Sequence, residues 1–144
     1  MPGELQPGDV FAGHRVLGVA GRGGMGVVYR ARHRALNRVV ALKVIGGVPG
    51  TSAADRDRFR TEAEAVAALQ HPNIIQIFEV GEWDGLPYCA LEFAPGGTLA
   101  QATGDRPFAP RAAAECVERL ARAMQFAHER GIVLCGYSAG SMCW

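Results

Sequence analysis

The sequence predicts an α+β fold, in which a five-stranded antiparallel sheet packs against one helix and is followed by a connector and one long helix. Three observations indicate this fold. Short segments rich in β-branched and aromatic residues fill the first half of the chain. An Asp84-Gly85 pair, typical of a tight hairpin, separates two of them. Two longer segments carry apolar residues at helical spacing.

We expect the strands at residues 11–19, 27–31, 38–45, 74–80 and 86–93. A glycine-rich turn over 21–26 joins the first two, and glycines at 46–50 end the third. The first helix begins after Ser52, a plausible N-cap, and places Asp55 in its first turn. It ends near Gln70, because His71 precedes a proline. The last helix begins at Pro110 and stops at Gly131.

The composition indicates a globular protein without a strong charge preference for its partners. Hydrophobic residues make up 49% of the 144 residues, charged residues make up 20%, and the net charge is +1. These values give no reason to expect binding to nucleic acid or to a charged membrane surface. The start has no signal-peptide pattern, and the uncharged stretch 132–144 is too short to span a membrane. We therefore expect a cytoplasmic protein whose four cysteines are reduced.

The glycine-rich turn fits the pattern G-x-G-x-x-G-x-V over residues 21–28. A plain turn in a chain with 19 glycines would also give this pattern. A dinucleotide-binding loop requires a helix after the glycines, whereas residues 27–31 favour a strand. A loop between two strands instead favours a cover for nucleotide phosphates, because glycines let backbone N–H groups approach the oxygens closely.

Lys43 is the one lysine among 15 basic residues, and it ends a V-A-x-K pattern on the third strand. Alternation along a strand puts Ala41 and Lys43 on one face. An exposed surface lysine is the simpler interpretation, but arginine fills every other basic position. We predict that Lys43 meets phosphates below the glycine turn. Glu62, rather than Glu64, is its expected ion-pair partner, because Glu62 flanks the apolar face of the first helix; an exposed glutamate is the alternative.

Together, the segments GRGGMGVVYRARH, VALK, RFRTEAEAVAALQ, HPNIIQIFEV and LPYCALEFAPGGTL resemble the N-terminal lobe of a bacterial Hanks-type serine/threonine protein kinase. The resemblance runs from about residue 9 to residue 133. It implies an ATP site in which Lys43 contacts the α- and β-phosphates and pairs with Glu62. The other residues that it implies at this site are Gly21, Gly23, Gly26, Val28, Ala41, Leu91, Glu92, Ala94 and Thr98.

Each of these residues has an implied role. The three glycines cover the nucleotide, and Val28 and Ala41 pack on the adenine. Leu91 resembles the gatekeeper, the connector residues Glu92 and Ala94 offer backbone groups to adenine, and Thr98 lies near the ribose. The domain organisation that follows is a leader over 1–8, a kinase-like N-lobe over 9–93, and a connector with the start of a C-lobe over 94–133.

The resemblance stops at residue 133. The family continues with His-Arg-Asp, but Leu134-Cys135-Gly136 follows here, so the residues that hold magnesium and accept the substrate proton are absent. We therefore expect a kinase-like ATP-binding lobe that does not transfer phosphate by itself, with no metal ligands of its own. A non-catalytic interaction module with a protein partner is the alternative function.

A third function is suggested by residues 134–144. Gly136-Tyr137-Ser138-Ala139-Gly140 fits G-x-S-x-G, and this segment resembles the nucleophile region of peptidase E-like serine peptidases. A hydrolase also needs a histidine base and its orienting partner. The four histidines all fall in kinase-like sequence, so a hydrolase fragment ranks last.

Overall fold

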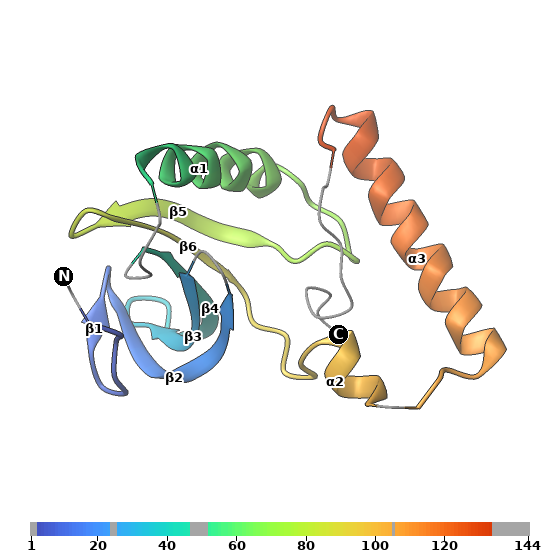
Figure 1. The fold of residues 1–144 in the computed structure, drawn as a ribbon, viewed down its shortest axis with the longest axis horizontal. Helices are drawn as coiled ribbons and strands as arrows, with labels where there is room; N and C mark the ends of the chain where they lie inside the picture. The colour runs from blue at the N-terminus through green and yellow to red at the C-terminus, as the bar shows by residue number, and fades with distance from the viewer. Residues whose placement is uncertain (1–2, 24–25, 47–51, 105, 134–144) are drawn as a thin grey trace. The chain divides into compact units, whose positions relative to one another are not determined.

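The computed structural model describes residues 3–23, 26–46, 52–104 and 106–133 (Figure 1). The chain divides into two compact units. The first unit comprises residues up to 68 together with 76–93, and it contains the sheet and one helix. The second unit comprises residues 69–75 and the chain from 94 onward. Among the described residues, no helix is both long enough and apolar enough to cross a membrane.

The first unit is a six-stranded antiparallel sheet in the order β1-β2-β3-β4-β6-β5. The strands are β1 (Val10–Phe11), β2 (His14–Gly23), β3 (Gly26–His33), β4 (Arg38–Ile45), β5 (Ile77–Trp83) and β6 (Leu86–Glu92). The predicted fold class is confirmed, and β4 matches its predicted bounds. The additional strand β1 arises because Ala12 (φ 46°) and Gly13 (φ 79°) turn the chain back onto β2. A left-handed alanine gives no signal in the sequence.

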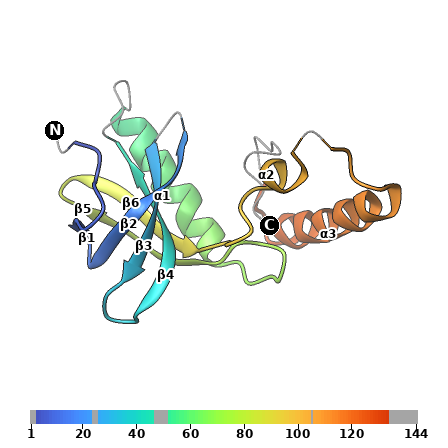
Figure 2. The ribbon, with the colours of Figure 1, turned by 90° about the horizontal axis from the view of Figure 1, so that it is seen from below.

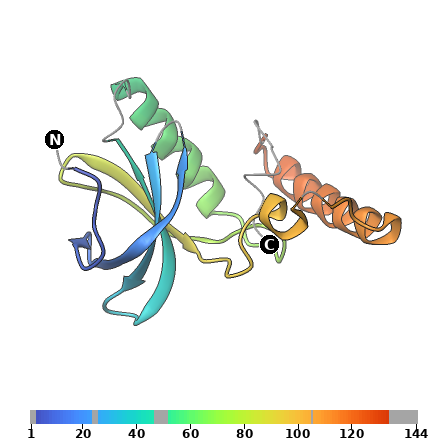
Figure 3. The same cartoon turned by 60° about the horizontal axis from the view of Figure 1, so that its bottom comes forward.

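The sheet is strongly curled (Figures 1 and 3). Each of its faces has its own hydrophobic core. The inner core contains Phe11, Val16, Tyr29, Ala31, Val40, Leu42, Val44, Tyr88 and Ala90. The second core lies under the helix α1 (Ala53–Ala67) and joins Phe59 and Ala63 to Ile45, Ile77 and Cys89. The helix packs on β5 and β6, as Figure 2 shows.

Helix α1 begins where the sequence predicts. The Ser52 hydroxyl accepts a hydrogen bond from the Asp55 amide at 3.1 Å, and the Asp55 carboxylate accepts one from the Ser52 amide at 2.9 Å. This capping box satisfies two backbone donors at the helix start. The predicted β5–β6 hairpin also forms, because Asp84 (φ 52°) and Gly85 (φ 74°) both take the left-handed conformation of a tight turn.

The second unit contains α2 (Leu99–Thr103) and α3 (Pro110–Glu129). Helix α3 begins at the predicted proline, and Gly131 (φ 75°) follows its end. Helix α2 was not expected from the sequence. Its start is a second capping box, in which Thr98 and Gln101 exchange hydrogen bonds at 2.8 and 3.1 Å. The Thr-x-x-Gln spacing is a sequence signature of this motif.

Gly26 holds β3 close against β4 and gives the first testable prediction. A Cβ at Gly26 would lie 2.0 Å from the Val44 carbonyl oxygen, which is backbone and cannot move independently. We expect Gly26→Ala to lower the free energy of unfolding by at least about 2 kcal/mol, measured by chemical denaturation. Gly18→Ala on β2 is the matched control, because nothing lies within 4 Å of its Cβ position. Equal effects of the two substitutions would contradict this account.

Candidate functional site

The strand register collects several of the predicted site residues of the first unit on one face of the sheet, whereas Glu92 pairs with the inner-core residue Val40. Gly21, Val28, Lys43 and Cys89 are successive cross-strand partners on β2, β3, β4 and β6. Ala41 and Leu91 are partners in a neighbouring row. Since residues paired across an antiparallel ladder point to the same side, Lys43 shares its face with Val28, Ala41 and Leu91. The second hydrophobic core, which lies under α1, is on the same face.

Lys43 occupies a half-buried position between this core and open surface. Its Nζ atom lies 5.6 Å from the centroid of the Phe59 ring on α1, within the range of a cation–π contact. The described side chains give it no ion-pair partner. The ammonium group therefore remains available to an anion from outside this part of the chain.

Glu62 does not meet Lys43 in this structure. The Nε atom of Arg58 donates to Glu62 Oε1 at 2.9 Å, and the Glu62 side chain is 66% exposed. The helix thus presents Phe59 and Ala63 to the sheet and turns Glu62 toward solvent. Glu64 has the same kind of partner, Arg60, at 3.0 Å. The Lys43–Glu62 ion pair stays a prediction, and it requires Glu62 to leave Arg58.

The three glycines of the predicted turn over 21–26 lie on strands instead, Gly21 and Gly23 at the end of β2 and Gly26 at the start of β3, and their surroundings differ. Gly26 is required by the close approach of β4 described above. A Cβ at Gly21 or Gly23 would meet nothing within 4 Å, and neither residue has a positive φ. The fold of the described residues therefore does not require glycine at 21 or 23. Residues 24 and 25, between Gly23 and Gly26 in the sequence, lie outside the described residues.

The predicted connector residues belong partly to each unit. The Glu92 amide donates to the Gln76 carbonyl at 2.8 Å, so this N–H group already has a partner. Ala94 and Thr98 belong to the second unit. The Thr98 hydroxyl caps α2 by accepting from the Gln101 amide.

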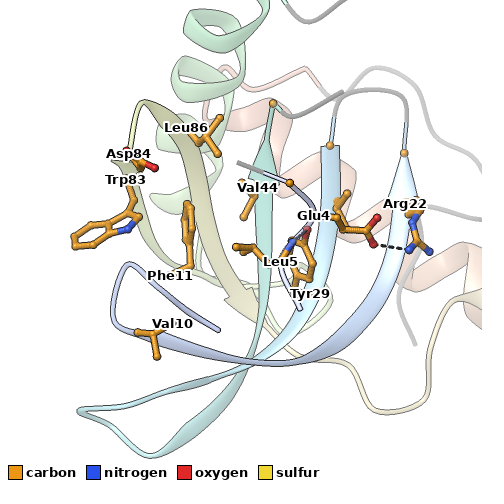
Figure 4. A pocket seen from close by; sticks show the side chains of 15 residues that line it. Glu4, Leu5, Val10, Phe11, Arg22, Tyr29, Val44, Trp83, Asp84 and Leu86 are labelled. Carbon is orange, nitrogen blue, oxygen red and sulfur yellow. Dashed lines mark hydrogen bonds and ion pairs between the residues drawn. The ribbon is translucent and has the colours of Figure 1, made fainter. Parts of the chain in front are cut away.

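A hollow of about 390 Å³ lies in the first unit, but it opens on the other face of the sheet (Figure 4). Val44 and Tyr29 line it, and Val44 alternates with Lys43 along β4. Phe11 and Leu5 project into it from the N-terminal segment, where Glu4 forms an ion pair with Arg22. This hollow is separate from the Lys43 face.

Cys89 is the neighbour of Lys43 that the sequence did not place in the site. It belongs to the core under α1, and it is 2% exposed. Burial raises the pKa of the Cys89 thiol to about 11, and the charge of Lys43 partly opposes this rise. Cys89 and Leu91 are two residues apart on one strand, and this spacing in the sequence is enough to place both on the same face.

The comparisons with known proteins agree on one family. The family model described as "Protein kinase domain" matches residues 14–135. The serine/threonine-protein kinase PknJ of Mycobacterium tuberculosis is 36% identical over 133 residues, which is 92% of this chain and 23% of PknJ. PrkC of Bacillus subtilis is 36% identical over 121 residues, which is 83% of this chain and 19% of PrkC. The chain thus spans about a quarter or less of these relatives.

Solved structures give the same result for the fold. The crystal structure of the PknI kinase domain of Mycobacterium tuberculosis superposes with a TM-score of 0.80 at 29% identity. The match covers 94% of this chain and 56% of that one. None of these comparisons addresses the predicted peptidase-like segment. That segment, with Ser138, lies outside the described residues, so its role stays a prediction.

The buried Cys89 thiol predicts a loss of stability at alkaline pH. A thiol whose pKa is raised by folding makes its full contribution to the free energy of unfolding below its pKa in the unfolded chain, about 8.5. This contribution is lost as the pH rises toward 11, the pKa of Cys89 in the folded chain. The difference corresponds to about 3 kcal/mol. We expect Cys89→Ala to flatten the decline in unfolding free energy between these pH values, measured by urea denaturation. The tyrosines Tyr29 and Tyr88, whose pKa values are also raised, titrate in both proteins. An unchanged slope would show that Cys89 does not cause the decline.

Proposed function

The chain belongs to the protein kinase domain family, and on that basis we propose that its sheet is the ATP-binding surface of a serine/threonine protein kinase. The observation that carries the proposal is the environment of Lys43. Lys43 is half-buried, has no carboxylate partner among the described residues, and shares a cross-strand row with Gly21. A cation held in this way favours an anionic ligand on the same face.

The glycines support phosphate as that anion. Neither Gly21 nor Gly23 is required by the packing of the described residues, and each leaves open space where a side chain would stand. Backbone N–H groups in such a turn can approach phosphate oxygens without steric clash. We propose that the turn covers the phosphates and that Lys43 contacts the α- and β-phosphates.

The apolar residues of this face suit a flat aromatic ring. Val28, Ala41 and Leu91 are brought to the Lys43 side of the sheet by the register. We propose that Val28 and Ala41 pack on the adenine and that Leu91 limits the depth of its pocket. The backbone of Glu92 and Ala94, with Thr98 beyond them, belongs to the same proposal as the connector side of the site.

Phosphoryl transfer needs groups that hold magnesium and accept the substrate proton. The printed sequence has Leu134-Cys135-Gly136 where the family has His-Arg-Asp. We therefore propose that these 144 residues bind nucleotide without transferring phosphate, and we assign no magnesium ligand. An interaction module that binds no nucleotide is the alternative, and a direct binding measurement distinguishes it.

The first test is a thermal-shift titration of the 144-residue chain with Mg-ATP. A ligand at 100 times its Kd stabilises a two-state fold by about 2.7 kcal/mol, which raises the Tm of a domain of this size by several degrees. We expect this shift in the parent and its loss in Lys43→Met. Arg15→Met, which removes an exposed cation from β2, is the control and should retain the shift. A cooperative melt that Mg-ATP leaves unchanged would favour the interaction module.

The second test concerns Glu62. Since Glu62 and Glu64 form similar exposed pairs with Arg58 and Arg60, Glu62→Gln and Glu64→Gln should each change the unfolding free energy by less than about 0.5 kcal/mol. If Glu62 moves to Lys43 when nucleotide binds, only Glu62→Gln weakens ATP binding, measured by calorimetry. Equal ATP affinities in the two variants would remove Glu62 from the proposed site.

A further inference from the structure

A cluster of two histidines and one glutamate lies on the sheet, away from Lys43. Within the described part of the chain, His14, His33 and Glu79 form a group whose potential ligand atoms all lie within 4.8 Å of one another. The Nε2 atoms of His14 and His33 are 3.8 and 3.9 Å from Glu79 Oε2. These are imidazole and carboxylate donors that converge on one point.

His14 is the unusual member of the cluster. Its side chain is 0% exposed, and neither ring nitrogen has a hydrogen-bond partner among the described residues. Burial of an unpaired polar group is costly, so most such groups in folded proteins have a partner. A ligand bound to His14 Nε2 on the Glu79 side would satisfy the nitrogen that faces the cluster.

The cluster joins strands that are far apart in the sheet. His14 and His33 are cross-strand partners on β2 and β3. Glu79 lies on β5, at the opposite edge of the strand order, beyond β4 and β6. The curl of the sheet brings β5 back toward β2 and β3 (Figure 3). A ligand at this point would connect the two sides of the curl directly.

Glu79 is held so that one oxygen faces both histidines. The Tyr88 hydroxyl donates to Glu79 Oε1, which leaves Oε2 toward the two Nε2 atoms. A hydrogen bond to the second oxygen of a ligating carboxylate is a common way to orient it. The geometry thus contains three donors and one supporting contact.

We propose that His14, His33 and Glu79 bind one divalent transition-metal ion of the zinc type, which clamps the curled sheet. Two imidazoles and a carboxylate suit Zn²⁺ and disfavour Mg²⁺, which prefers oxygen ligands. Ligand atoms around a tetrahedral zinc ion are about 3.3 Å apart, so the donors must close in by an ångström or so. Glu79 and His33 are 39% and 24% exposed and can adjust, whereas His14 is fixed by the core.

Binding has one identifiable cost. The Leu36 amide donates to His33 Nδ1 at 3.1 Å, which places the ring hydrogen of neutral His33 on Nε2. Metal binding at Nε2 moves this hydrogen to Nδ1, so the Leu36 hydrogen bond is lost. The turn over residues 34–37 is exposed and can accommodate the change. The Leu36 amide is therefore a specific reporter of metal binding.

The test is zinc titration of the chelator-treated 144-residue chain, followed by calorimetry and thermal unfolding. We expect one Zn²⁺ per chain and a rise in Tm, with at least tenfold weaker binding in His33→Gln and in Glu79→Gln. Tyr88→Phe, which removes the supporting hydrogen bond, should weaken binding about 10- to 100-fold. His128→Gln, an exposed histidine on α3, is the control and should bind as the parent does. Circular dichroism checks that each variant is folded.

A second readout identifies the ligands. Co²⁺ bound at this cluster gives a spectrum without a sulfur-to-cobalt charge-transfer band, and the Leu36 amide resonance shifts on zinc addition. Three results would overturn the proposal: no zinc binding by the parent, equal binding in the folded His33 and Glu79 variants, or a thiolate band that assigns the metal to cysteines. A stability that depends on pH but not on zinc would instead indicate a histidine–carboxylate ion pair.

Discussion

The position of β4 in the sheet is the constraint on which the rest of the structure depends. The strand is paired along both edges, and its faces look into different hydrophobic cores. Val40, Leu42 and Val44 fill the inner core, while Ala41 and Lys43 point to the side that α1 covers. A slip of one residue would exchange the two sets and put an ammonium group into the inner core. The register that buries leucine therefore also fixes the position of Lys43.

The placement of the charged side chains on α1 follows from the same separation of the sheet into two faces. The helix buries Phe59 and Ala63 and pairs the carboxylates of Glu62 and Glu64 with arginines of its own exposed face. Because these pairs are local, they stabilise the helix without neutralising Lys43. The sheet face below keeps a positive charge beside an aromatic ring and a buried thiol. The candidate site thus stays positively charged because Glu62 and Glu64 point away from it.

The features predicted from the sequence are those that depend on neighbours along the chain. The Ser52 N-cap, the Asp84-Gly85 turn and the bounds of β4 all follow from local patterns. Alternation along β4 was enough to put Ala41 and Lys43 on one face. The rotation of α1 about its axis, which turns Glu62 outward, is decided by packing against β5 and β6. The convergence of the β2–β3 histidines with β5 depends on the curl of the whole sheet.

The glycines at the end of β2 and the start of β3 are subject to different structural constraints. Backbone geometry alone excludes a side chain at Gly26, whatever the protein binds. Nothing in the described fold excludes one at Gly21 or Gly23, so the packing of the described residues does not account for glycine there. If the proposed nucleotide site accounts for Gly21 and Gly23, a lineage that kept this fold but lost that site would retain the third glycine while the first two drifted. The pattern of glycines across descendants would then be a record of when binding was lost.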